Sequence, residues 1–366
     1  MSRTDIEQFT SAGVPPLQGP RVVDADVHLK YTAEIRSEVA RYMDRPYRDY
    51  VDPETTADSY PHHGWPKSLG GERKFNLLEV SSPETVERVL CDGFGVDTPV
   101  VNVFSPVDKA IKSDRAIAEM RGINDFLLDR FLDGSDMYGL AAIAARDPEA
   151  AAEEVDRLGD EKRIVGAYFT LAEEFNDPMG DPSYDVLFRA LSDNDLTPVY
   201  HITGMHRKAK ALREMEKVAS WHTLGPLWSA QRAVTSLVFR GVPEKFPDLD
   251  HVVLEGGLGA WIPALMARMN REHGQWGSEL PMLERSPEAY IRDKFYFGTQ
   301  PMDEFEDPEH MRRVIDMIGA ESLVFATDFP HYDFDHPSAL ADFLRHLDDE
   351  GQERVLHGNA SEVFGL

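Results

Sequence analysis

Ionisable side chains follow the apolar runs of this sequence at regular places. Near the start, Asp24, Asp26 and His28 alternate with Ala25 and Val27. A β-strand repeats every two residues, so the two acids and the imidazole would share one face of a strand. Buried carboxylates need partners or a metal ion. This face therefore indicates a metal-binding or catalytic site rather than simple core.

Three later apolar runs each end in one ionisable group: His201, Glu255 and Asp328. The strands of a parallel barrel place their catalytic residues at their carboxyl ends, which meet at one face. We therefore expect these three groups to converge with Asp26 and His28. His331 lies three residues after Asp328 and is expected to act as a ligand or a proton shuttle. Asp24 is expected to orient the ligands rather than to bind the metal.

The elements that must position these groups are short β-rich runs separated by helical patterns. Several helices are opened by aspartate followed by proline, as at Asp147, Asp181 and Asp307, a pair suited to the first helical turn. The clearest helices are predicted at about Ser113 to Leu132 and Asp147 to Leu158. Strands are predicted at Arg21 to His28, Pro99 to Phe104, Met137 to Ala144, Ile164 to Thr170, Thr197 to Thr203, His251 to Gly256, Lys294 to Gln300 and Leu323 to Asp328.

Strands and helices that alternate in this way predict an α/β fold with a parallel sheet, and eight strands predict a (β/α)8 TIM barrel. An open doubly wound sheet is the competing hypothesis. It is disfavoured because no Gly-x-Gly-x-x-Gly turn follows the first strand.

The spacing of the strands predicts one domain with an insertion. We expect an N-terminal extension over 1–20 and a single metal-dependent barrel domain over 21–366. About 70 residues separate the first two strands, against roughly 30 for a βα unit. The excess, 31–95, is rich in aromatic residues and proline. Insertions after barrel strands lie at the catalytic face, so we expect a cap or substrate wall there, with a plain surface loop as the alternative.

Composition narrows the classes of protein. The 366 residues include 65 acids and 38 bases, for a net charge of −27, and one cysteine. A single cysteine excludes thiolate-rich metal sites, so any metal must be held by oxygen and imidazole. The acidity argues against nucleic-acid and membrane partners. With neither a long apolar span nor a signal-peptide pattern, the expected location is the cytoplasm.

Together these motifs resemble those of the amidohydrolase-related (amidohydrolase 2 type) TIM-barrel metalloenzymes. The resemblance runs from about Arg21 to the C-terminus. It is carried by the Asp-x-Asp-x-His opening, His201, Glu255-Gly256-Gly257 with Gly259-Ala260-Trp261-Ile262-Pro263, Asp328-Phe329-Pro330-His331, Asn359-Ala360 and Phe364-Gly365-Leu366. It implies that a divalent metal is bound by Asp26, His28, His201 and Asp328.

The chain departs from parts of that family. Aromatic-acid decarboxylases of this fold usually carry His-x-His or Glu-x-His in strand 1 and a catalytic histidine in strand 6, where this chain has Asp26 and Glu255. Strand 4 has no lysine, which excludes the carbamylated-lysine bridge of binuclear amidohydrolases. The carboxylate-rich site is similar to the branch that includes the nonheme diiron monooxygenases of diterpenoid (platensimycin/platencin-type) biosynthesis. Glu255 and His331 could then supply a second metal.

Two functions follow from these observations. The favoured one is a diiron monooxygenase that uses two Fe ions and O2 to hydroxylate an apolar, terpenoid-type substrate, with Asp328, His331 and Glu255 as catalytic residues. Its argument is that one metal needs fewer ligands than the sequence offers. The alternative is a mononuclear hydrolase or decarboxylase with one Zn or Mn, in which the metal polarises the substrate and Asp328 moves the proton. A degenerate, non-catalytic barrel is disfavoured because the cluster is complete.

A basic run after His201 indicates a small-molecule partner that carries phosphate, such as an acyl-CoA. Four of the eight residues from His206 to Arg213 are basic in an otherwise acidic chain. An ordinary solvated helix face is the alternative explanation. The protein could also form a homodimer. The predicted phosphate contacts are Arg207, Lys208, Lys210 and Arg213.

Overall fold

The structure is a computed structural model of the chain. It describes residues 17, 21–30, 33–50, 82–104, 107, 113–171, 177–202, 217–331, 334–335 and 343–366. The basic run from His206 to Arg213 lies outside these residues, so the predicted phosphate contacts stay a prediction. In the part of the chain that the structure describes, no helix is long and apolar enough to cross a membrane.

Eight parallel strands form one sheet whose order follows the chain. The sheet returns on itself, because the amides of Ala25 and His28 donate to the carbonyls of Phe325 and Phe329, just beyond the last strand. The predicted (β/α)8 TIM barrel is confirmed. Its strands are β1 Val23–Lys30, β2 Thr98–Phe104, β3 Tyr138–Ala142, β4 Ile164–Thr170, β5 Thr197–His201, β6 His251–Leu254, β7 Phe295–Gly298 and β8 Leu323–Val324.

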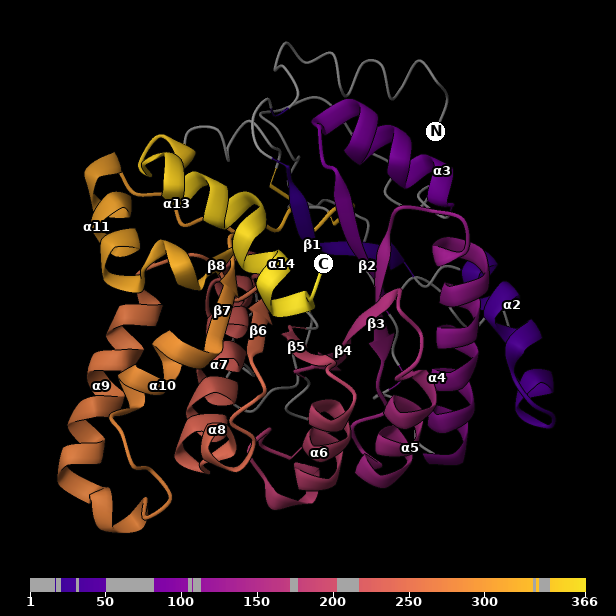
Figure 1. Cartoon of the computed structure of the whole chain (residues 1–366), viewed down its shortest axis with the longest axis horizontal. Helices are drawn as coiled ribbons and strands as arrows, with labels where there is room; N and C mark the ends of the chain where they lie inside the picture. The colour runs from indigo at the N-terminus through magenta and orange to yellow at the C-terminus, as the bar shows by residue number, and fades with distance from the viewer. Residues whose placement is uncertain are drawn as a thin grey trace.

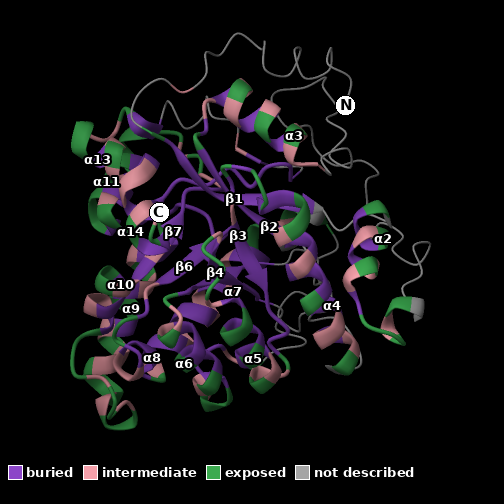
Figure 2. Cartoon of the chain, turned by 45° about the vertical axis from the view of Figure 1, so that its right-hand side comes forward, coloured by how far each residue is buried: buried purple, intermediate pink, exposed green. Residues whose placement is uncertain are grey.

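Helices surround the strands, which lie buried at the centre while the outer helix faces meet solvent (Figures 1 and 2). The predicted aspartate caps are confirmed: Asp147 accepts from the amide of Ala150, and Asp181 and Asp307 cap their helices in the same way. The α-helices are α2 Ala33–Tyr42, α3 Pro83–Val86, α4 Ser113–Leu127, α5 Pro148–Leu158, α6 Asp185–Asp193, α7 Val218–Phe239, α8 Val242–Lys245, α9 Trp261–Trp276, α10 Pro287–Lys294, α11 Pro308–Ile318, α13 Asp349–Glu353 and α14 Asn359–Phe364.

Shorter helical turns extend or join these helices. Turns of π-helix follow α3, α4 and α13 directly, and turns of 3-10 helix lie in the connections. They are η1 Tyr47–Tyr50, η4 Glu87–Phe94, η6 Leu128–Leu132, η7 Pro182–Tyr184, η9 Gly277–Glu279, η10 Ala320–Ser322 and η11 Arg354–Gly358.

The hydrophobic core has two parts. The smaller one fills the end of the barrel opposite the ionisable groups. The larger part lies between strands and helices, and the smaller one holds Val23, Ala25, Val199 and their neighbours together with Val363 of α14. The Thr197 hydroxyl, at the start of β5, donates to the carbonyl of Val363. Helix α14 therefore covers the amino ends of the strands and leaves their carboxyl ends for the site.

The segment expected to form a cap is described only in part. Its first helix, α2, packs on α4, with the rings of Tyr42 and Phe126 6.1 Å apart. Residues 51–81 lie outside the described part of the chain. The cap over 31–95 and the domain limits stay predictions.

Candidate functional site

The three ionisable residues of β1 do not all point to the same part of the barrel. Asp24, Asp26 and His28 are all buried. The register of β1 against β2 shifts between Asp24 and Val27. Asp26 and His28 face the strand ends, whereas Asp24 lies against Thr327. The two-residue repeat of a strand therefore predicts correctly that Asp26 and His28 share a face. The prediction that Asp24 shares this face is wrong.

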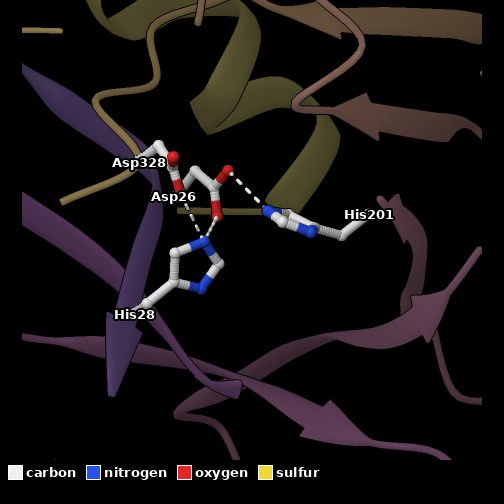
Figure 3. A group of neighbouring side chains, drawn as sticks. All are labelled: Asp26, His28, His201 and Asp328. Atoms are coloured by element: carbon white, nitrogen blue, oxygen red, sulfur yellow. Dashed lines mark ion pairs between the residues drawn. The ribbon is translucent and has the colours of Figure 1, made fainter. Parts of the chain in front are cut away.

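Four side chains from three parts of the barrel meet at the carboxyl ends of the strands (Figure 3). His28 Nε2 lies 2.7 Å from Asp328 Oδ1 and 3.3 Å from Asp26 Oδ1. His201 Nε2, from the end of β5, lies 3.2 Å from Asp26 Oδ2. The two imidazole rings are nearly perpendicular, at 88°, with their centroids 4.7 Å apart. One potential ligand atom from each of the four residues lies within 4.8 Å of the others.

Both histidines hold their protons on the nitrogen that points away from this centre. His201 Nδ1 lies 2.7 Å from the carbonyl oxygen of Ile202, which can only accept a hydrogen bond. His28 Nδ1 lies 2.7 Å from Asn102 Oδ1, while the Asn102 amide donates to Asp26. Each Nδ1 therefore carries a proton, which leaves Nε2 of each ring as the nitrogen that faces the centre and can bind a metal.

The donor set fits a divalent metal ion. Asp26 Oδ2 and both carboxylate oxygens of Asp328 are buried, and among the described residues the side chains that approach these oxygens are histidines. His28 Nε2 and Asp328 Oδ1 lie only 2.7 Å apart, a contact that either a proton or a metal ion between them would satisfy. Ligands held about 2.1 Å from one ion lie about 3 Å from each other. Asp26, His28, His201 and Asp328 are therefore able to hold one metal.

A second group borders the first and shares Asp328 with it. His331 Nδ1 lies 3.0 Å from Asp328 Oδ2 and 3.9 Å from Glu255 Oε1, and Glu255 Oε2 lies 3.5 Å from His201 Nδ1. All three members are buried. Glu255 has a φ of 53° and Asp328 one of 60°, left-handed values that are rare outside glycine and typical of functional sites.

The charges of this group act on Asp328. Burial opposes the charged form of its carboxylate, but the neighbouring His331 and His28 outweigh burial and hold the pKa below its usual value. Asp24 shows the opposite balance. Burial raises its pKa to about 7, although hydrogen bonds from Thr327 counteract the rise.

Three residues near the site were not predicted. Asn102 orients His28, Thr327 binds Asp24, and Tyr168 places its ring 5.2 Å from that of His201. A signal for Asn102 exists, because it is the one polar residue of the run from Pro99 to Phe104. Thr327 and Tyr168 carry no comparable signal, since a threonine or tyrosine in a strand is ordinary core material.

The fold and the site together define a TIM barrel with a candidate metal centre of carboxylate and imidazole ligands. A family model described as "Amidohydrolase" matches residues 94–366. The chain belongs to this amidohydrolase family. The resemblance to it predicted from the motifs is thereby confirmed.

Curated relatives extend the match over most of the chain. The gamma-resorcylate decarboxylase of Polaromonas sp. is 27% identical over 338 residues, which cover 87% of this chain and 96% of the relative. The enzyme of the same name from Rhizobium sp. is 25% identical over 337 residues, with the same coverage of both chains.

Solved structures agree on the fold. An amidohydrolase from Mycobacterium avium subsp. paratuberculosis has a TM-score of 0.74 at 15% identity and covers 95% of this chain and all of its own. A dihydroxybenzoic acid decarboxylase from Polaromonas sp., with bound manganese and the inhibitor 2-nitroresorcinol, has a TM-score of 0.67 at 18% identity, covering 95% and 98%. At these identities the likeness establishes the barrel alone.

These comparisons overturn the favoured functional prediction. The named relatives are decarboxylases and none is an oxygenase, so the diiron monooxygenase is wrong, and two Fe ions with O2 have no support. The error came from counting ligands. Glu255 and His331 do lie at the site, but buried carboxylates and imidazoles can also store and move protons, so their number does not set the number of metals.

Proposed function

We propose that this protein is a decarboxylase of small aryl carboxylic acids that carry a hydroxyl group beside the carboxylate. The observation that carries the proposal is a complete set of buried ligands for one metal in a chain whose curated relatives, aligned over 87% of it, are named decarboxylases. The relatives' names supply the substrate class, resorcylate or dihydroxybenzoate.

One divalent metal, Mn or Zn, would be held by Asp26, His28, His201 and Asp328. Two carboxylates with two imidazoles suit these ions. A metal held there would act as a Lewis acid that helps to bind and orient the acidic substrate. The residues of this chain hold the ligands in place and handle the proton.

The charges at the site favour a stored proton. Asp26, Glu255 and Asp328 are three carboxylates, each at most 4% exposed. One divalent ion neutralises two of these charges, and burial of the third without a partner is costly. A proton on His331, beside both Glu255 and Asp328, completes the neutralisation and supplies the proton that the reaction consumes.

Proton delivery would run from His331 through Asp328. His331 Nδ1 lies 3.0 Å from Asp328 Oδ2, within hydrogen-bond range for transfer. Asp328 passes the proton to the ring carbon that bears the carboxylate. The bond between that carbon and the carboxylate then breaks, its electron pair returns to the ring, and CO2 leaves. His331 thus takes the role that the resemblance gives to a strand 6 histidine, where this chain has Glu255.

The test is turnover by metal-loaded protein. Purified chain is stripped with a chelator, reloaded with Mn2+ and incubated with 2,6-dihydroxybenzoate and related 2-hydroxybenzoates, while CO2 release and loss of the acid are followed. We expect equal amounts of CO2 and phenolic product with at least one acid, and none in the stripped protein. If the loaded protein binds one metal and releases no CO2 from any of these acids, the proposal is wrong.

A further inference from the structure

We infer that Asp24 and Thr327 form a clamp that fixes the backbone on both sides of Asp328 and thereby sets the geometry of the metal ligands. The inference rests on the proposed metal site. It assigns positioning roles to two buried residues that do not reach the metal centre themselves.

The clamp joins the first strand of the barrel to the turn that follows the last strand. Asp24 Oδ1 accepts from the amide of Thr327 at 3.0 Å, and Oδ2 accepts from the Thr327 hydroxyl at 2.6 Å. The same hydroxyl oxygen accepts from the amide of Phe329 at 3.1 Å. The residues before and after Asp328 are therefore held through one hydroxyl group.

Asp24 also holds the ligand on its own strand. Its Oδ1 accepts from the amide of Asp26 at 3.2 Å. One carboxylate thus fixes the backbone beside both acidic ligands, Asp26 and Asp328. Because the two come from opposite ends of the chain, this shared anchor sets their separation.

Asp328 needs such an anchor because its backbone is strained. Its φ of 60° lies in the left-handed region, which a side chain with a β-carbon rarely adopts. Without the clamp, the segment is free to relax toward an ordinary φ. That relaxation would turn the Asp328 carboxylate away from His28 Nε2, which now lies 2.7 Å from it.

Asp24 does not act as a ligand itself. Among the described residues it makes no ion pair with a histidine, and its two oxygens are occupied by Thr327 and the Asp26 amide. Thr327 and Asp24 are both fully buried. Their role is therefore exerted through the residues they hold.

Thr327 offers a matched pair of substitutions. Thr327→Val keeps the shape of the side chain but removes the hydroxyl, whereas Thr327→Ser keeps the hydroxyl. Asp24→Asn tests the other partner. The affinity for Mn2+ is measured by calorimetric titration of stripped protein without substrate. The electron paramagnetic resonance spectrum of bound Mn2+ and the thermal midpoint are recorded beside it.

We expect Thr327→Val and Asp24→Asn each to weaken Mn2+ binding about 10- to 100-fold and to change the spectrum, with Thr327→Ser within about twofold of the parent. The double variant should lose little more than either single one. Folded Val and Asn variants with parental affinity and spectrum would refute the clamp, as would a lowered midpoint alone. Absence of decarboxylation in a parent that binds Mn2+ tightly would refute the proposed function and leave the clamp standing.

Discussion

His28 Nε2, on the first strand of the barrel, lies 2.7 Å from Asp328 Oδ1, in the turn that follows the last strand. On the other side of the ring, His28 Nδ1 donates a hydrogen bond to Asn102 Oδ1. A metal ion held by the site would contact both His28 Nε2 and Asp328 Oδ1. Residues from the two ends of the chain therefore meet in one candidate metal site.

Removal of one imidazole ligand should abolish tight metal binding. His201→Gln leaves three of the four assigned ligands, so we expect Mn2+ affinity to fall by at least about 100-fold and decarboxylation with it. The metal content after dialysis and the titration of stripped protein measure this. His310→Gln, on the exposed side of α11, is the matched control and should bind one metal like the parent. Retention of one tightly bound metal by the His201 variant would contradict the assigned ligand set.

Removal of the proposed proton store should affect turnover more than metal content. His331→Gln keeps a polar side chain beside Asp328 but cannot carry a proton. We expect kcat to fall by about 100-fold or more, with one metal still bound, because general acid catalysis of this kind contributes about 10²–10⁴. Rate and metal content measured on the same sample separate the two effects. A variant with parental kcat would exclude His331 from proton delivery.

Glu255 distinguishes one metal from two. With a single metal held by the other four residues, Glu255→Gln should leave one Mn2+ per chain and lower kcat, since it borders His331 and His201 without completing the ligand set. Metal analysis of parent and variant measures this. A parent with two metals and a variant with one would show that Glu255 binds a second ion.

Much of the barrel and its site could be predicted from the sequence, because both depend on local patterns. Strands β4 and β5 begin where the apolar runs of the sequence begin. Asp26 and His28 share a face because side chains of a strand alternate every two residues. The last strand was predicted too long. It ends at Val324, since the chain leaves the ladder there to form the turn that carries Asp328.

What could not be predicted depends on contacts between distant segments. The direction of Asp24 follows from a register shift against β2, and its partner Thr327 lies at the far end of the chain. Nor does a sequence reveal whether Glu255 and His331 bind a metal or a proton, because both roles use the same side chains. The wrong prediction of a diiron monooxygenase arose from this ambiguity.

Stability should fall on mild acidification because of a histidine far from the metal centre. His251, at the start of β6, is fully buried against Tyr200 and stacks on Phe295 with ring centroids 4.9 Å apart. Burial, aided by the charge of Lys294, lowers its pKa from 6.5 to about 3. Between these values the unfolded chain binds a proton that the folded chain does not, so stability rises with pH in this window and is lost as the pH falls below about 6.5.

Between pH 7 and pH 5 this histidine alone should cost about 2 kcal/mol of the free energy of unfolding. Urea unfolding at both pH values, with a chelator present to remove any effect of metal, measures the loss. His251→Gln can still accept from the Tyr200 hydroxyl but does not titrate. The variant should therefore be less stable at pH 7 yet lose about 2 kcal/mol less than the parent on going to pH 5. Equal losses in both proteins would show that His251 is protonated in the folded state, or that the acid sensitivity arises elsewhere.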